Sequence, residues 1–195
     1  MRERWLRDGR REAALRVIGG YALLATLATT LALALRDGAP WVYPDPWFPQ
    51  PPELALLSSA VLGVIAAVAI IALTRLTVPR FAWARRLHSE LRPVARDFGL
   101  GHILVVAGFS SLGEELLFRG LLVPTVGVWL AAALFGLAHQ IKGPSRWVWA
   151  GWATGMGLLL GSIFALTGSL VGPLLAHAIV NAVNLVYLRD HDVAY

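Results

Sequence analysis

Residues 101–123 have the sequence GHILVVAGFSSLGEELLFRGLLV, an apolar run of membrane-spanning length with two adjacent acids and one arginine inside it. Glu114 and Glu115 are the only acids between Gly101 and Leu188. A charge inside a bilayer is costly, so ionisable residues in such a segment usually face the protein interior and mark function. This stretch therefore predicts both a membrane fold and the place of its functional site.

The composition is that of an integral membrane protein. Hydrophobic residues make up 57% of the 195 residues, and the mean hydropathy is +0.63. The net charge of +5 does not indicate nucleic-acid binding, because the arginines cluster between the apolar runs, as the positive-inside rule describes. With no cysteine in the chain, disulfides, thiolate metal sites and a cysteine nucleophile are excluded.

The hydropathy pattern predicts an all-α, polytopic transmembrane helical bundle of about six spans. The predicted spans are residues 17–35, 54–73, 101–123, 126–139, 147–167 and 169–188. Residues 1–16 carry six arginines, so we expect a basic leader on the cytoplasmic side and an N-terminus inside. We expect the first span to be retained rather than cleaved as a signal peptide, because it is long and a second span follows.

Two polar segments connect these spans. Residues 36–53 contain six prolines and four aromatic residues, which predicts an irregular loop at the outer membrane–water interface. Residues 75–96 contain six arginines. Apolar residues recur around them at helical spacing: Ala84, Leu87, Leu91, Val94 and Phe98. This pattern predicts an interfacial amphipathic helix, bent near Pro93.

Strongly polar residues within the spans occur in pairs. Glu115 and Arg119 are four residues apart and share a helix face, which predicts a buried ion pair. Glu114 is rotated by about 100° from Glu115, so we expect the two carboxylates to have different partners. His177 and Asn181, also four residues apart, project together.

Glu114, His139 and His177 form a set suited to holding a water molecule, although each alone could be a satisfied interior group. A carboxylate in a poorly hydrated site is suited to take a proton from water. The water could be held by hydrogen bonds, or by a zinc ion bound to these three residues, since imidazole and carboxylate are usual zinc ligands. Asn181 offers an amide N–H to a developing oxyanion.

Three short motifs occur in order on three apolar segments: Glu-Glu-x-x-x-Arg at 114–119, Phe-x-x-x-His at 135–139 and His-x-x-x-Asn at 177–181. On these residues the chain resembles the CPBP intramembrane proteases, the CAAX-protease and bacteriocin-processing family, also called Abi. The resemblance covers roughly residues 100–188.

The resemblance implies a role for each candidate residue. Glu114 and His139 would activate the water, and His177 and Asn181 would stabilise the oxyanion. The residues that would support the site are Glu115, Arg119 and Phe135. The resemblance also implies that no cofactor is required, with zinc on Glu114, His139 and His177 as the alternative.

We therefore divide the chain into a basic leader (1–16), two N-terminal spans with the amphipathic helix (17–99), a catalytic core (100–188) and a tail (189–195). The hypothesis is an intramembrane endopeptidase of a bacterial cytoplasmic membrane. Its partners would be membrane lipids and a membrane-associated peptide or protein, cut at a leader or C-terminal tail. The alternatives are a non-catalytic scaffold or immunity protein, a proton-coupled transporter, and a rhomboid-like serine protease that uses Ser110.

Overall fold

The structure is a computed structural model that describes residues 2–36 and 38–193, with side chains from residue 15 onward. Within these residues the regular structure is helical, and the one β-type contact is an isolated bridge between Val42 and Ser169. The prediction of an all-α bundle is confirmed. In chain order the elements are α1 (Arg2–Leu35), α2 (Pro52–Thr77), α3 (Ala82–Leu91), the 3₁₀ turn η1 (Arg92–Val94), α4 (Leu100–Glu115), the π-helix η2 (Leu116–Leu122), α5 (Val123–Ala138), α6 (Arg146–Thr167) and α7 (Val171–Asp190).

Five helical stretches of the described chain, rather than the predicted six, are long and apolar enough to cross a membrane. These stretches are Leu15–Leu35, Pro52–Thr77, Leu100–Ala138, Arg146–Thr167 and Val171–Asp190. The difference arises because the third and fourth predicted spans are joined without an intervening loop. Their combined 39 residues are far longer than one crossing of a core about 30 Å thick.

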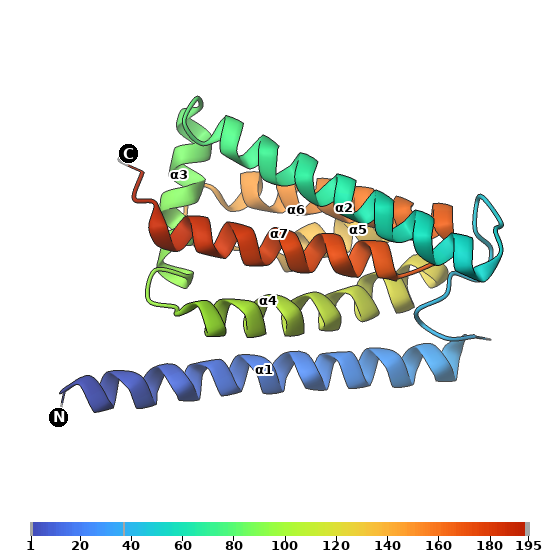
Figure 1. The fold of residues 1–195 in the computed structure, drawn as a ribbon, viewed down its shortest axis with the longest axis horizontal. Coiled ribbons are helices and arrows are strands. Elements are labelled where there is room, and N and C mark those ends of the chain that lie inside the picture. The colour runs from blue at the N-terminus through green and yellow to red at the C-terminus, as the bar shows by residue number, and fades with distance from the viewer. Residues whose placement is uncertain (1, 37, 194–195) are drawn as a thin grey trace.

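The joined stretch turns back at Gly127, where φ is 83° and ψ is 164°. This backbone conformation suits glycine, because a side chain would be strained there. Figure 1 shows α4 and η2 running to one end of the bundle and α5 returning beside α6. The segments from Glu114 to Gly127 and from Gly127 to His139 are of similar length. Glu114 and His139, the ends away from Gly127, therefore lie at a similar depth in the bundle. The fourth predicted span is therefore present as the returning helix α5, whose end at His139 lies beside Glu114 inside the bundle.

The helices that carry the motifs pack closely through glycine. A side chain at Gly136 of α5 would overlap Thr154 of α6, and one at Gly63 of α2 would overlap the backbone of Gly172 in α7. Small residues at such crossings let membrane helices approach at backbone distance. Ser59 of α2 accepts the backbone N–H of Gly172 at 2.9 Å, which satisfies an amide in the first turn of α7.

The amphipathic helix predicted after the second span is present as α3, and the chain enters η1 at Arg92, next to Pro93. Ala84 and Leu87 are buried, whereas Val94 is exposed, so the apolar face ends where η1 begins. In Figure 1, α3 crosses the end of the bundle at which both chain termini lie. We call this end of the molecule the interfacial end.

At the opposite end, the proline-rich loop covers the turn between α6 and α7. Tyr43 donates its backbone N–H to the Gly168 carbonyl at 2.9 Å, and its ring packs edge-on against Phe164 at 5.4 Å between centroids. Trp41 and Trp47 are exposed, as expected of aromatic residues at a membrane surface.

Candidate active site

A cavity of about 320 Å³ brings the predicted catalytic residues together. Its walls come from all seven α-helices of the described chain, and it extends from the acid doublet to α3. The four candidates that line it are Glu114, His139, His177 and Asn181. Helices distant in sequence therefore place all four side chains around one space.

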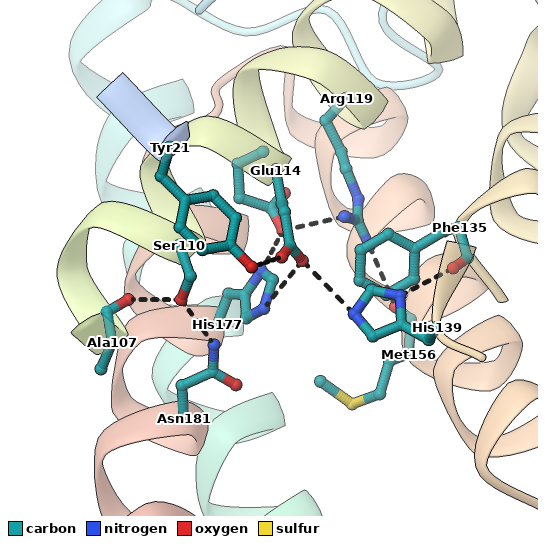
Figure 2. Close-up of polar contacts among 11 residues, drawn as sticks. Tyr21, Ala107, Ser110, Glu114, Arg119, Phe135, His139, Met156, His177 and Asn181 are labelled. Atoms are coloured by element: carbon teal, nitrogen blue, oxygen red, sulfur yellow. Dashed lines mark hydrogen bonds and ion pairs between the residues drawn. The ribbon is translucent and has the colours of Figure 1, made fainter. Parts of the chain in front are cut away.

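The carboxylate of Glu114 lies at the centre of this group (Figure 2). Its Oε1 accepts a hydrogen bond from the Tyr21 hydroxyl at 3.0 Å. Its Oε2 lies 3.5 Å from His139 Nε2 and 3.7 Å from His177 Nε2, and has no hydrogen-bond partner among the described residues. These separations exceed the usual hydrogen-bond length. One carboxylate oxygen is thus held, and the other faces two imidazoles.

The opposite nitrogen of each imidazole is already engaged. His139 Nδ1 lies 2.7 Å from the Phe135 carbonyl oxygen, and His177 Nδ1 lies 2.7 Å from Glu115 Oε1. A carbonyl or carboxylate oxygen can only accept, so we assign a proton to both Nδ1 atoms. In the neutral rings, Nε2 is then an acceptor. Three acceptor atoms therefore converge on the cavity, an arrangement suited to a water molecule that donates its protons.

Glu115 and Arg119 form the ion pair expected from their spacing. Arg119 Nη1 donates to Glu115 Oε1 at 2.9 Å, and both side chains are fully buried. The prediction that the two acids have different partners was wrong, because His177 contacts both Glu114 and Glu115. The imidazole presents nitrogens on two edges, so one ring can lie between carboxylates that point in different directions.

Phe135 supports the site by packing. The Arg119 guanidinium lies 4.5 Å from its ring centroid, a cation–π contact, and Phe118 packs edge-on at 4.9 Å. The His139 ring lies 4.3 Å from Phe135 between centroids. Phe135 therefore lies between the Glu115–Arg119 ion pair and the His139 imidazole, and it contacts both Arg119 and His139.

The helix that carries the acids changes from α to π directly after Glu115. The π-helix η2 covers Leu116–Leu122, where the sequence analysis expected a regular α-helix. π-Helical turns are rare and occur often at functional sites. The contact between Glu115 and Arg119 is kept across this change.

Asn181 lies beside the site, with its amide engaged by a serine. Its Nδ2 donates to Ser110 Oγ at 3.2 Å, and the Ser110 hydroxyl donates to the Ala107 carbonyl at 3.3 Å. Neither partner of Ser110 can act as a base, which does not favour the serine-protease alternative. The second N–H of Asn181 remains a donor for a group bound in the cavity.

Tyr21 is the site residue that the sequence analysis missed. It lies on α1, outside the predicted catalytic core, and lines the cavity with its hydroxyl on Glu114. The only sequence signal is that Tyr21 is the sole aromatic residue among residues 17–35. No motif spacing connects it to Glu114.

A zinc ion at this site would take Glu114, His139 and His177 as its ligands. These three residues supply atoms of the right chemical type. However, no group of three His, Cys, Asp or Glu side chains within the described part of the chain is arranged to hold a metal ion.

Comparison with known proteins identifies the region that contains these residues. Residues 97–183 match the family described as "Type II CAAX prenyl endopeptidase Rce1-like". Over 92 residues the chain is 34% identical to the uncharacterized protein YpbD of Bacillus subtilis (strain 168), and the match covers 47% of this chain and 48% of YpbD. The matched part is thus about half the length of that relative, and no solved structure matches the chain.

All three motifs lie within the family match, whereas Tyr21 lies outside it. The matched region also contains every residue that the motifs single out, from Glu114 to Asn181. Together with the five long apolar helices, the match indicates an integral membrane protein that is similar in its core to CAAX endopeptidases. The resemblance seen in the sequence is confirmed over the core of the chain: residues 97–183 match the Rce1-like CAAX endopeptidase family.

Proposed function

We propose that this protein is an intramembrane endopeptidase in which Glu114 activates a water molecule. The observation that carries the proposal is the position of Glu114 Oε2. This atom is buried and lacks a hydrogen-bond partner among the described residues, and it lies within 3.7 Å of two imidazole Nε2 atoms at the wall of a cavity. A buried acceptor without a partner is costly, so such a site favours a bound donor.

In the proposed reaction, the water donates hydrogen bonds to Glu114 Oε2 and to His139 Nε2. Glu114 takes one proton while the oxygen of the water bonds to the scissile carbonyl carbon. The tetrahedral intermediate then collapses, the carbon–nitrogen bond breaks, and the proton passes from Glu114 to the leaving amine. The products are a new carboxyl terminus and a new amino terminus, and Glu114 is again ionised.

Two groups are suited to hold the negative charge on the carbonyl oxygen. Asn181 has an amide N–H that is not used by Ser110. His177 can donate from Nε2 when its ring carries both protons, and the Glu115 carboxylate on Nδ1 would balance that charge. In a site with little water these interactions are stronger than in solution.

The substrate we propose is a membrane-associated peptide with an apolar segment. Most of the cavity lining between the acids and α3 is apolar, including Trp83, Leu87, Trp149 and Trp152. For this chain we propose cleavage at a leader peptide or a C-terminal tail. We further propose a bacterial cytoplasmic membrane as its location, with the N-terminus inside, so that α3 and the adjacent end of the cavity face the cytoplasm.

The test uses the full chain reconstituted in liposomes with two quenched fluorescent peptides. One peptide ends in a farnesylated Cys-aliphatic-aliphatic-x sequence, and the other is an apolar leader peptide. Glu114→Gln is expected to lower cleavage by about a hundredfold or more, because the amide cannot take a proton. The control is Glu53→Gln, an exposed acid at the start of α2, which should leave the rate unchanged.

Three outcomes would contradict the proposal or a part of it. Equal cleavage by wild type and Glu114→Gln would exclude Glu114 as the base. A folded wild type that cleaves neither peptide would favour the scaffold alternative. Loss of cleavage on treatment with a chelator, restored by zinc, would show that the reaction needs the metal.

A further inference from the structure

We propose that Tyr21 is a positioning residue that fixes the orientation of the Glu114 carboxylate, so that Oε2 is the oxygen that accepts the proton. The inference rests on the proposed function and extends it to the first span. Its basis is the hydrogen bond from the Tyr21 hydroxyl to Glu114 Oε1, which Figure 2 shows on the side of the carboxylate away from His139.

The two oxygens of Glu114 have different surroundings because of this bond. Oε1 is occupied by the phenol, whereas Oε2 faces both Nε2 atoms. Both imidazoles have their Nδ1 protons directed away from Glu114, so neither neutral ring can donate to the carboxylate. Among the described residues, Tyr21 therefore supplies the one hydrogen bond that holds Glu114. A hydrogen bond to an ionised oxygen is among the stronger kinds.

The backbone places Tyr21 against the acid doublet. A Cβ atom at Gly113 would lie 2.9 Å from the Tyr21 carbonyl oxygen and 3.2 Å from its ring, so only glycine allows this approach of α1 to α4. Further along α1, the Arg36 guanidinium donates to the Gly120 carbonyl of η2. Both contacts are made to the helical segment that carries Glu114. Gly113 directly precedes Glu114, and Gly120 follows it by six residues. The first span is thus fitted to that segment at two points.

The position of α1 in the bundle supports the positioning role of Tyr21. It packs chiefly on α4 and η2 and lies at the edge of the bundle in Figure 1. Most of its large side chains, such as Leu23, Leu27 and Leu31, are exposed, as in a helix that faces lipid. A helix that served only as an anchor would need no polar group directed inward. The inward hydroxyl of Tyr21 therefore indicates that α1 helps to position the Glu114 carboxylate.

The test is Tyr21→Phe, which removes the hydroxyl and keeps the ring and its packing. With the peptide that wild type cleaves, we expect kcat to fall by about tenfold to a hundredfold with KM unchanged, because a hydrogen bond to a charged group is lost. The matched control is Tyr43→Phe, which loses a hydroxyl in the outer loop and should retain the wild-type kcat.

A purely structural role predicts no change in kcat for Tyr21→Phe, and that result would overturn the inference. A rise in KM with unchanged kcat would also overturn it, because Tyr21 would then contact substrate. If the inference is right, Tyr21→Phe will have a smaller effect in a Glu114→Asp background, where the shorter side chain has already withdrawn the carboxylate. Full additivity of the two losses would contradict it.

A measurement without substrate separates this inference from the proposed function. The phenol band of Tyr21, assigned in the infrared difference spectrum of wild type and Tyr21→Phe, is expected to shift in Glu114→Gln. If the band shifts but neither peptide is cleaved by wild type, the protease proposal fails and the contact stands. An unshifted band would overturn the inference whatever the activity.

Discussion

The two ends of the cavity hold their polar groups in different ways. Beside the buried end, but not lining the cavity, Arg119 pairs with Glu115 and both side chains are excluded from solvent. At the interfacial end, α3 and η1 bind the tail that follows α7: His88 Nε2 of α3 lies 2.8 Å from the His191 carbonyl oxygen, and Arg92 of η1 pairs with Asp192 at 3.3 Å. Asp192 is 76% exposed, whereas Glu115 is 0% exposed.

This difference shows which contacts the fold depends on and which it can replace. Water can take the place of Asp192 as a partner for Arg92, so that ion pair contributes little. No water can replace Arg119 beside Glu115 without entering a packed interior. Removal of one partner there leaves a buried charge uncompensated. An ion pair between an arginine and an acid therefore contributes more to the stability of the fold at the buried end than at the interfacial end.

The largest effect is expected for Arg119→Met, which removes the charge but keeps most of the volume. The variant should lose about 3–5 kcal/mol of stability, because the Glu115 carboxylate is left buried and loses its cation. Arg92→Met at the interfacial end should lose about 1 kcal/mol or less. Unfolding in detergent with increasing denaturant measures both. Similar losses for the two variants would show that the proposed contrast between the ends is wrong.

The next effect concerns the two histidines that line opposite ends of the cavity. His139→Ala is expected to lower kcat by about a hundredfold or more, since an acceptor for the attacking water is lost. His88→Ala should leave kcat near the wild-type value, because His88 lies at the α3 end and contacts the tail. Steady-state cleavage of the peptide substrate measures both. A loss of kcat in His88→Ala as large as that in His139→Ala would remove the functional distinction between the ends.

How far the sequence predicts this structure also differs between regions. The pairing of Glu115 with Arg119 could be predicted from their spacing along one helical segment. The convergence of Glu114, His139, His177 and Asn181 was expected only from the three motifs taken together. The contact from Tyr21 could not be predicted, since it joins helices far apart in sequence and depends on the absence of a side chain at Gly113.

Two other features depended on conformations that hydropathy does not report. The reversal at Gly127 is set by one backbone conformation within an apolar run, so hydropathy gave no indication that the two helices join there without a loop. The tail contact of His88 joins α3 to residues beyond the last span, and the apolar spacing in α3 gave no indication of it. In both cases the local pattern was correct and the tertiary arrangement was not contained in it.

The smallest effect is expected from pH at the interfacial end. Burial lowers the pKa of His88 below its usual 6.5, and the nearby charges of His191, Arg92 and Arg75 act in the same direction, against the hydrogen bond to the His191 backbone. His88 is therefore neutral when the tail is bound, and a released or unfolded state takes up a proton more readily. Attachment of the tail should be complete above pH 6.5 and weaken as the pH falls below it. Hydrogen exchange of the backbone amides of residues 191–193, compared at each pH with His88→Gln, measures this effect.

In His88→Gln, the amide can still donate to the His191 carbonyl but does not titrate, so the difference between wild type and variant isolates the His88 proton. The variant should keep its protection down to lower pH than the wild type. If both proteins lose protection together as the pH falls, His88 is not the group that titrates. That result would contradict the role given to the buried histidine.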